Sequence, residues 1–285
     1  MKSITLDAPA KINLYLDVIN KRRDSYHNIV TIFQKLELCD RIKVSIAKRG
    51  ISILVDSTDL PSGRRNLVYK AASLMKKEFK IKDGLDISIE KKIPIAAGLG
   101  GGSSDAGAVI LAIIDLFNLR VSSSRLVMLA RTIGADVAFF VSGYNCAMGR
   151  GIGDRLKQLK THTPCYILLL VPRLHIYTKS IYSNMTLRLT KPIMDVNLLT
   201  HILSRKDGLT KAASSLYNRL EDVVLPIYPI VSEGKTILSS YAKGALLSGS
   251  GPAIFGLFSK RKEAERARRD ISRDKRWQLF LTKKA

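Results

Sequence analysis

The sequence predicts an α+β protein of two domains, and three observations support this prediction. The chain has 285 residues, and a single hydrophobic core stops growing at about 250–300 residues, so two packed domains are expected. Hydrophobic residues make up 46% and charged residues 25% of the chain, which is typical of globular proteins and excludes collagen-like, low-complexity and wholly disordered chains. Segments with the apolar pattern of strands are interspersed with segments at helical spacing.

The first half of the chain contains three predicted strands and three predicted helices. In the strands, β-branched and apolar residues alternate or cluster. In the helices, apolar residues recur every three or four positions, as Leu67, Ala71 and Leu74 do. Asn66 occupies the position of an N-cap, and Gly134 ends the third helix. The predicted strands are residues 4–18, 42–55 and 85–89, and the predicted helices are 66–79, 103–117 and 123–133.

The composition changes after Gly153, and we place the domain boundary there. The apolar run at 166–171 predicts a strand in the middle of a sheet. No internal repeat and no Pro-, Gly- or Ser-rich linker separates the halves, so we expect domains 1–153 and 154–285 to share a tight interface with a cleft. The later predicted elements are helices 196–203, 209–222, 230–241 and 262–272, a strand–turn–strand at 245–258, and a strand at 278–281.

The charge of the chain is strongly positive. Lysine and arginine number 47 against 24 acidic residues, a net charge of +23, and such a surface attracts polyanions. Residues 259–285 hold eleven basic and four acidic residues, a surplus of seven. The interleaved aromatic residues of an RNA-recognition sheet are absent from the basic segments. The charge therefore indicates a solvated basic surface rather than a nucleic-acid partner.

Three features predict a cytoplasmic protein with no membrane partner. The longest uncharged apolar run, residues 106–114, is nine residues long, whereas a membrane helix needs roughly 20. Asp7 precedes any apolar run, so no secretory signal is expected. Cys39, Cys146 and Cys165 form no CxxC pair, which favours reduced thiols over disulfides or a zinc site.

Residues 94–104, which we call the glycine loop, are the most informative segment. Four glycines and two serines lead directly into a helix, where backbone N–H groups and the helix dipole favour an anion. Ser103 or Ser104 can cap this helix or offer a hydroxyl to a phosphate or its magnesium ion. A flexible loop with a serine cap is the alternative, but the glycines cost conformational entropy that a connector does not require. The pattern therefore favours a phosphate cradle.

Other candidate motifs leave alternatives open. The turn at 248–252 predicts either a β-hairpin or a backbone wall beside the same phosphates. Gly234 to Thr236 resembles the end of a Walker A loop, but Pro229 stands at the first glycine position and the stretch reads as helix. A dinucleotide-binding fingerprint fails because Ser103 takes the place of its third glycine.

Several single residues could act in catalysis or binding, and each has a structural alternative. Lys11 interrupts an apolar run and is either solvated or aimed into a cleft. Asp136 either caps the next turn or serves as a base, and Tyr26 with His27 forms either a loop tip or a ring-stacking contact. The other histidines lack metal-ligand spacing. They are His162, His175 and His201.

Taken together, these motifs resemble those of the GHMP kinases (galacto-, homoserine, mevalonate and phosphomevalonate kinases). The triple glycine with Ser103 and Ser104, and the pair Tyr26 and His27, resemble the branch of the non-mevalonate isoprenoid pathway that acts on a cytidyl diphosphate of methylerythritol. The resemblance implies a ribosomal-protein-like N-terminal domain and an α+β C-terminal domain, with the active site in the cleft between them. The motifs are Pro-Ala-Lys-x-Asn at 9–13, Arg-x-Asp-x-Tyr-His at 22–27, the glycine loop, Gly-Ala-Asp-Val at 134–137, Gly-Arg-Gly-Ile-Gly at 149–153 and Ser-Gly-Ser-Gly-Pro at 248–252.

The resemblance also implies a reaction and roles for individual residues. The γ-phosphoryl group of ATP would pass to the 2-hydroxyl of the cytidyl-diphospho-methylerythritol, with Mg²⁺ bridging the phosphates. Asp136 would accept the hydroxyl proton, and Lys11 would hold Asp136 ionised and stabilise charge on the transferred group. The implied ATP-binding residues are Asn66 near the adenine and, around the phosphates, Pro94, Ile95, Ala96, Ala97, Gly98, Leu99, Gly100, Gly101, Gly102, Ser103 and Ser104, of which Ser104 is also the candidate metal ligand. The implied substrate-binding residues are Asn13, Tyr26, His27, Phe33, Asp136, Thr178 and Tyr182, with Tyr26, His27 and Tyr182 at the cytosine.

The residue chemistry agrees with this reaction, because a loose phosphoryl-transfer transition state needs chiefly alignment and nearby positive charge. The sequence departs from the family pattern at four positions. Asn20 and Ser25 replace a usual glycine, Ala138 a common proline and Tyr182 a common phenylalanine. Ser25 is strained if its turn needs a positive φ.

The sequence leaves two alternative functions, a GHMP kinase for another small alcohol and a basic nucleic-acid-binding protein of related fold. A GHMP kinase for another small alcohol would have no use for an aromatic clamp made by Tyr26, His27 and Tyr182, which suits a pyrimidine. A basic nucleic-acid-binding protein of related fold would suit the charge of +23. It would leave Lys11, the glycine loop and Asp136 without a purpose.

Overall fold

The computed structural model describes residues 2–56, 63, 65–161, 165–185, 196–205 and 208–285, with the side chains of 208–210 left out. The chain forms two compact units, each assembled from separate segments. The first contains Met1–Ala10, Leu38–Ile95 and Gly100–Tyr144, and the second contains Lys11–Glu37, Ala96–Leu99 and Asn145–Ala285. The predicted division into domains 1–153 and 154–285 stays a prediction.

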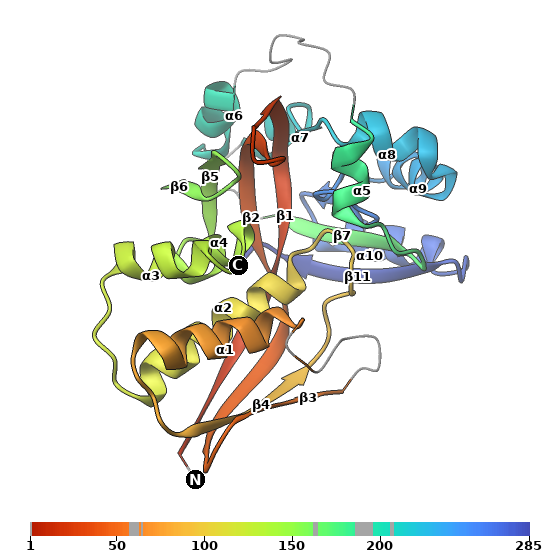
Figure 1. The fold of residues 1–285 in the computed structure, drawn as a ribbon. Coiled ribbons are helices and arrows are strands. Elements are labelled where there is room, and N and C mark those ends of the chain that lie inside the picture. The colour runs from red at the N-terminus through yellow and green to blue at the C-terminus, as the bar shows by residue number, and fades with distance from the viewer. Residues whose placement is uncertain (1, 57–62, 64, 162–164, 186–195, 206–207) are drawn as a thin grey trace. The chain divides into compact units, whose positions relative to one another are not determined.

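The first unit pairs helices with one end of a sheet. Its strands run in the order β3-β4-β2, with β4 antiparallel to β2 and parallel to β3. Helices α1 and α2 lie side by side (Figure 1), and α2 is buried on most of its surface. The elements are β2 (His27–Ala47), β3 (Ile51–Val55), β4 (Gly84–Glu90), α1 (Leu67–Glu78), α2 (Gly101–Leu116), α3 (Ser123–Arg131) and α4 (Ala135–Val141).

The second unit contains the other end of that sheet and a separate four-stranded sheet. The first has the order β6-β5-β2-β1-β8 and the second has the order β11-β7-β10-β9. Strand β7 lies between β10 and β11, in the middle of this sheet, as predicted from its apolar run. The strands are β1 (Ser3–Lys21), β5 (Cys146–Arg150), β6 (Arg155–Gln158), β7 (Tyr166–Pro172), β8 (Tyr217–Asn218), β9 (Gly244–Leu247), β10 (Ile254–Phe258) and β11 (Trp277–Lys283). The helices are α5 (Thr178–Ser183), α6 (Val196–Leu203), α7 (Gly208–Ala213), α8 (Glu221–Ile227), α9 (Pro229–Ser239) and α10 (Arg261–Ile271).

Several elements differ from those predicted. The strand predicted at 42–55 is interrupted near Gly50, which has a φ of +78°, and β2 extends back to His27. The helix predicted at 209–222 is wrong, because α7 ends at Ala213 and Tyr217 pairs in parallel with Tyr15 of β1. Helix α4 and strands β5 and β6 were not predicted. The α+β class is confirmed, and Asn66 caps α1 as expected, since its Oδ1 accepts a hydrogen bond from the Val68 N–H at 2.9 Å.

Candidate active site

The glycine loop enters α2 differently from the prediction. Helix α2 begins at Gly101, and its N-cap is Gly100 with a φ of +73° and no side-chain cap. The alternative of a serine cap is therefore wrong: Ser103 and Ser104 lie in the first helical turn, where the Ser104 N–H donates to Gly100 O at 2.9 Å. An α-helix leaves its first N–H groups without intrahelical partners, and these groups attract anions. The start of α2 therefore has the backbone geometry expected of a phosphate cradle.

Ser104 has a buried hydroxyl at this helix start. Its side chain is 1% exposed, and Oγ has no hydrogen-bond partner within the part of the chain that the structure describes. Leaving a buried hydroxyl without a partner costs about 1–3 kcal/mol. This orphaned oxygen fits the expectation that Ser104 meets a phosphate or its metal ion.

Beside the helix start lies a buried ionic cluster, formed by Lys91, Asp40 and Asp105. Lys91 Nζ donates to Asp105 Oδ2 at 2.8 Å and also to Asp40 Oδ2. The other Asp40 oxygen accepts the backbone N–H groups of Lys92 at 2.6 Å and Ile93 at 2.8 Å. The cluster therefore connects β2, the segment after β4, and α2. Sequence reasoning missed it, although Asp105 stands out as a carboxylate in an apolar helix.

Burial and charge act against each other in this ionic cluster. Burial alone would lower the pKa of Lys91, but the charges of Asp105 and Asp40 outweigh it and raise that pKa. Burial raises the pKa of Asp105 to about 7, despite the opposing charge of Lys91. The cluster thus keeps the lysine charged and makes Asp105 the group that titrates near neutral pH.

The second glycine turn, residues 248–252, packs against the glycine loop. The Ser248 hydroxyl donates to Gly98 O at 3.0 Å, and the Ala253 N–H donates to Ala97 O at 3.1 Å. Gly98 has a φ of +77°, and a Cβ there would lie 2.1 Å from Ser248 O. Only glycine fits this approach. The turn joins the antiparallel strands β9 and β10, so it is a hairpin turn that also forms a wall of the glycine loop.

Asn218 holds this second turn in place, and sequence reasoning did not single it out. Its Nδ2 donates to Leu247 O and to Gly249 O, both at 2.8 Å. The side chain is 2% exposed, so these bonds form away from water. An asparagine at the end of a short strand gives no signal for this role, because its partners are distant carbonyls.

Lys11 is buried, so the alternative of a solvated lysine is wrong. Its side chain is 4% exposed and Nζ donates to Asn13 Oδ1 at 2.7 Å. Nζ also lies 5.8 Å from the centre of the Phe33 ring, within the range of a cation–π contact. The Lys11 backbone N–H donates to Leu99 O at 2.9 Å. The structure therefore brings three predicted site residues, Lys11, Asn13 and Phe33, together beside the glycine loop.

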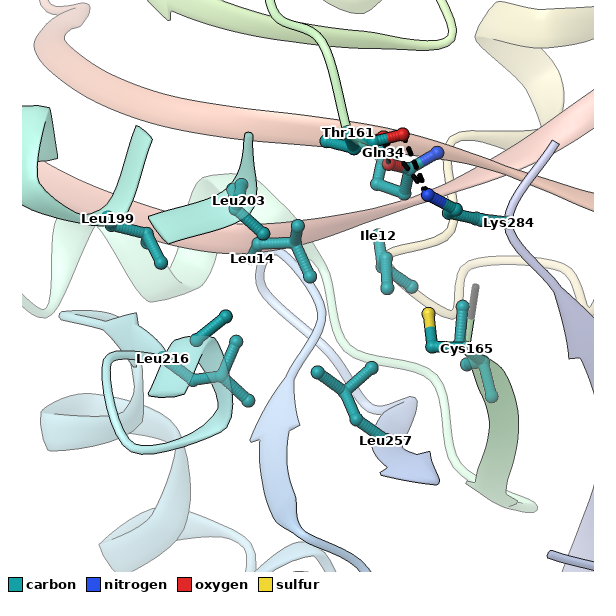
Figure 2. Close-up of a pocket in the computed structure, with 12 residues that line it drawn as sticks. Ile12, Leu14, Gln34, Thr161, Cys165, Leu199, Leu203, Leu216, Leu257 and Lys284 are labelled. Carbon is teal, nitrogen blue, oxygen red and sulfur yellow. Dashed lines mark hydrogen bonds between the residues drawn. The ribbon is translucent and has the colours of Figure 1, made fainter. Parts of the chain in front are cut away.

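The opposite face of this stretch of β1 borders a small apolar cavity. Ile12 and Leu14 line it (Figure 2), and side chains alternate between the faces of a strand, so Lys11 and Asn13 point the other way. The cavity measures about 30 Å³, which is room for about one water molecule. Figure 2 shows Lys284 directed toward Thr161, whose carbonyl accepts its hydrogen bond at 2.9 Å. The cavity therefore lies on the face of β1 opposite to Lys11 and Asn13, and it is too small to hold a substrate.

Two of the residues predicted to meet the cytosine, His27 and Tyr182, contact each other, and their contact with the base stays a prediction. Their ring centres are 5.1 Å apart and their planes are tilted by 32°. Burial, together with the charge of Lys21, lowers the pKa of His27 below its usual value, so the imidazole is neutral at pH 7. Tyr26 is 62% exposed, and the preceding Ser25 has a φ of +66°. The turn does require the positive φ that makes serine unfavourable at this position.

The remaining predicted residues are placed singly. Thr178 Oγ1 and Ser250 Oγ lie 2.8 Å apart. Asp136 is half-buried in the first turn of α4, in the first unit, whereas Lys11 belongs to the second. The predicted pairing of Lys11 with Asp136 stays a prediction, as do all contacts with ATP and substrate.

Among the described residues, no three His, Cys, Asp or Glu side chains gather as metal ligands. His175 and His201 are exposed, and His162 lies outside the described residues. None of the described helices is both long enough and apolar enough to span a membrane. The three cysteines are free thiols, as predicted.

Comparisons with known proteins cover nearly the whole chain. The GHMP kinases N terminal domain matches residues 66–144, and the GHMP kinases C terminal domain matches residues 202–275. The 4-diphosphocytidyl-2-C-methyl-D-erythritol kinase of Acetivibrio thermocellus is 38% identical over 283 residues, 99% of each chain. That of Syntrophus aciditrophicus is 38% identical over 277 residues, 97% of each chain.

Solved structures give the same picture. A crystal structure of 4-(cytidine 5'-diphospho)-2C-methyl-D-erythritol kinase is similar with a TM-score of 0.82 and 35% identity, over 99% of this chain and 100% of that one. A homoserine kinase from Cytophaga hutchinsonii is similar with a TM-score of 0.73 and 17% identity, over 100% of this chain and 95% of that one. At that identity the second comparison shows a shared fold only.

Proposed function

Because the chain belongs to the GHMP kinase family, we propose that it transfers the γ-phosphoryl group of ATP to the 2-hydroxyl of 4-diphosphocytidyl-2-C-methyl-D-erythritol. The protein is an ATP-dependent kinase of a small molecule. The observation that carries the choice of substrate is the 38% identity over 99% of the chain to a relative of that name. The neighbouring rings of His27 and Tyr182 support it, because flat rings suit a pyrimidine base.

The start of α2 is the proposed site of the ATP phosphates. Backbone N–H groups at the N-terminus of a helix stabilise negative charge, and the glycines let a phosphate approach the backbone. Magnesium, when bound with ATP, would neutralise charge on the phosphates. Ser104 is the side chain proposed to reach it, because its buried hydroxyl has no partner among the described residues. Asn66, the cap of α1, is proposed to lie near the adenine.

Lys11 and Asp136 carry the proposed chemistry. Asp136 accepts the proton of the attacking hydroxyl, and Lys11 stabilises the charge that develops on the transferred group. Lys11 is suited to this role because its ammonium is buried and oriented by Asn13. In a buried position its charge acts more strongly than in water. Direct transfer then needs only alignment of the hydroxyl with the γ-phosphorus.

The second unit holds the residues proposed to bind the cytidyl substrate. A neutral His27 can both stack on a base and hydrogen-bond to it, and the low pKa caused by burial keeps it neutral at pH 7. Asn13, Tyr26, Phe33, Thr178 and Tyr182 complete the proposed substrate site. We place the reaction in the cytoplasm, because three free thiols suit a reducing compartment.

A magnesium-dependent assay with ATP and 4-diphosphocytidyl-2-C-methyl-D-erythritol tests this function. ADP release and the new phosphomonoester signal in ³¹P NMR are expected for the wild-type protein. Asp136→Asn should lower kcat by about 10²–10⁴-fold, the usual contribution of a general base, while ATP binding persists. Turnover with homoserine or mevalonate, but not with the cytidyl substrate, would assign a different alcohol. If no alcohol is phosphorylated, the kinase function is wrong.

A further inference from the structure

We propose that Thr31 is a positioning residue, which fixes the Asn13 amide and through it the Lys11 ammonium. This inference rests on the proposed function, in which Lys11 acts on the transferred phosphoryl group. Thr31 lies on β2, and its side chain is fully buried. None of the sequence motifs includes it, because a threonine within an apolar strand is unremarkable.

Two hydrogen bonds connect Thr31 to Lys11 through Asn13, and a third holds Thr31 to the backbone. Lys11 Nζ donates to Asn13 Oδ1 at 2.7 Å, and Asn13 Nδ2 donates to Thr31 Oγ1 at 2.8 Å. The Thr31 hydroxyl in turn donates to the backbone carbonyl of Tyr15 at 2.7 Å. Asn13 and Lys11 are 1% and 4% exposed. The whole chain of bonds is thus removed from water, where hydrogen bonds are stronger and their loss is costly.

The donors and acceptors allow only one direction along this chain. A carbonyl can only accept, so the Thr31 hydroxyl must give its single proton to Tyr15 O. Its oxygen then accepts from Asn13, which must present its NH₂ group to Thr31 and its carbonyl oxygen to Lys11. An ammonium has only donors, so this amide orientation suits Lys11 as well. Thr31 therefore selects the Asn13 orientation that holds the lysine.

The Thr31 side chain is itself held by packing. Thr31 pairs with Gly149 of β5, and a Cβ on that glycine would lie 3.1 Å from the Thr31 methyl group and 2.9 Å from Cε2 of Phe33. Because Gly149 has no side chain, the side chains of Thr31 and Phe33 can pack close to its backbone. A β-branched side chain has few χ1 choices, so the methyl contact with Gly149 also directs the hydroxyl toward Asn13.

On its other side the pair of Lys11 and Asn13 is closed by the second glycine turn. A Cβ on Gly249 would lie 3.3 Å from Lys11 Nζ and 3.5 Å from Asn13 Oδ1. With the backbone this close, a rotated Asn13 amide would place an NH₂ group against the lysine ammonium. Losing the Thr31 hydroxyl is therefore expected to displace Lys11 rather than to leave its position unchanged.

The test compares Thr31→Val, which keeps the shape but removes the hydroxyl, with Thr31→Ser, which keeps the hydroxyl. In the kinase assay, Thr31→Val should lower kcat by about 10–100-fold, the scale of a small misplacement of a reacting group. KM for ATP should stay within about twofold of the wild-type value, because Thr31 lies outside the phosphate site. Thr31→Ser should restore kcat to within about threefold. If Thr31→Val does not fold, Thr31→Ala replaces it.

Two further measurements separate positioning from a structural effect. In an Asn13→Ala background, Thr31→Val should lower kcat no further, because the two residues act through one chain of bonds. The Asn13 side-chain N–H signals in NMR should exchange slowly in the wild type and Thr31→Ser, and faster in Thr31→Val. Unchanged kcat, unchanged Asn13 signals or full additivity would overturn the inference. A wild-type protein that phosphorylates no alcohol would instead overturn the proposed function and, with it, the catalytic part of this inference.

Discussion

The two units each bury a lysine beside the glycine loop, but they surround it differently. In the first unit, Lys91 meets two carboxylates, Asp40 and Asp105, and its side chain is 7% exposed. In the second unit, Lys11 donates to the neutral amide of Asn13. Two acidic partners neutralise the buried cation of Lys91, and the Asn13 amide orients that of Lys11.

The two lysines therefore have different expected roles: Lys91 stabilises the fold, and Lys11 acts in the proposed reaction. Asp40 and Asp105 neutralise the charge of Lys91, so this charge has little effect outside the ionic cluster. The same bonds join three segments of the chain. Asn13 orients Lys11, whose charge in the proposed function acts on the transferred phosphoryl group. We therefore expect substitutions at Lys91 to lower stability and substitutions at Lys11 to lower turnover.

The largest expected effect is on stability. Lys91→Met leaves two buried carboxylates without their cation, which should lower the free energy of unfolding by about 3–5 kcal/mol. Urea denaturation measures it. Lys92→Met is the matched control: Lys92 pairs with Glu90 at the surface, where an ion pair contributes only about 0–1 kcal/mol. Equal losses for the two variants would contradict the structural role of Lys91.

The next effect is on turnover. Lys11→Met should lower kcat by about 10²–10³-fold, the usual result of removing one transition-state donor. The loss of its hydrogen bond to Asn13 should lower the free energy of unfolding by about 1 kcal/mol. Steady-state kinetics and thermal denaturation measure the two quantities, with the exposed Lys43→Met as the control. A stable Lys11→Met enzyme with normal kcat would remove the distinction between the two lysines.

The third expected effect is a pH dependence of the free energy of unfolding that comes from the titration of Asp105. Burial raises the pKa of Asp105 to about 7 in the folded protein, against about 3.9 when unfolded. Between these values the folded state binds more protons, so Asp105 stabilises the protein fully below about pH 4 and its contribution disappears as pH rises through about 7. Asp105→Asn should remove this decline, which amounts to roughly 1 kcal/mol per pH unit.

Urea denaturation at pH 5, 6 and 7.5 compares the wild type with Asp105→Asn and with Asp86→Asn, an exposed carboxylate of β4. Only Asp105→Asn should differ from the wild type in how its free energy of unfolding depends on pH. Parallel curves for all three proteins would mean that the ionic cluster does not titrate in this range.

The smallest expected effect lies in the turn that precedes Tyr26 in the second unit. Ser25 has a φ of +66°, a conformation that costs a residue with a Cβ about 1–2 kcal/mol. Ser25→Gly removes this cost but adds chain entropy of about 0.5–1 kcal/mol to the unfolded state, so stability should rise by up to about 1 kcal/mol. Thermal denaturation measures the change, with Ser25→Ala expected to give no gain. A loss with glycine would show that the serine side chain contributes more than its strain costs.

Local sequence determined the elements whose signals lie close together in the chain. Asn66 caps a helix through its own neighbour Val68. The apolar run of β7 predicts a central strand because only the middle of a sheet buries both faces. The glycine loop predicts a phosphate site, because glycines let an anion approach the backbone at a helix start, and the resemblance of the ordered motifs indicated the kinase family.

Tertiary structure alone decided the placements that depend on distant partners. Strand β8 forms because Tyr217 pairs with Tyr15, about 200 residues earlier in the chain. Lys91 can be buried because Asp40 of β2 accepts its hydrogen bond, and the proposed role of Thr31 depends on an amide in β1. A sequence shows which side chains can donate or accept, but burying a polar group requires its partner within hydrogen-bond distance. Only the folded chain brings such partners together.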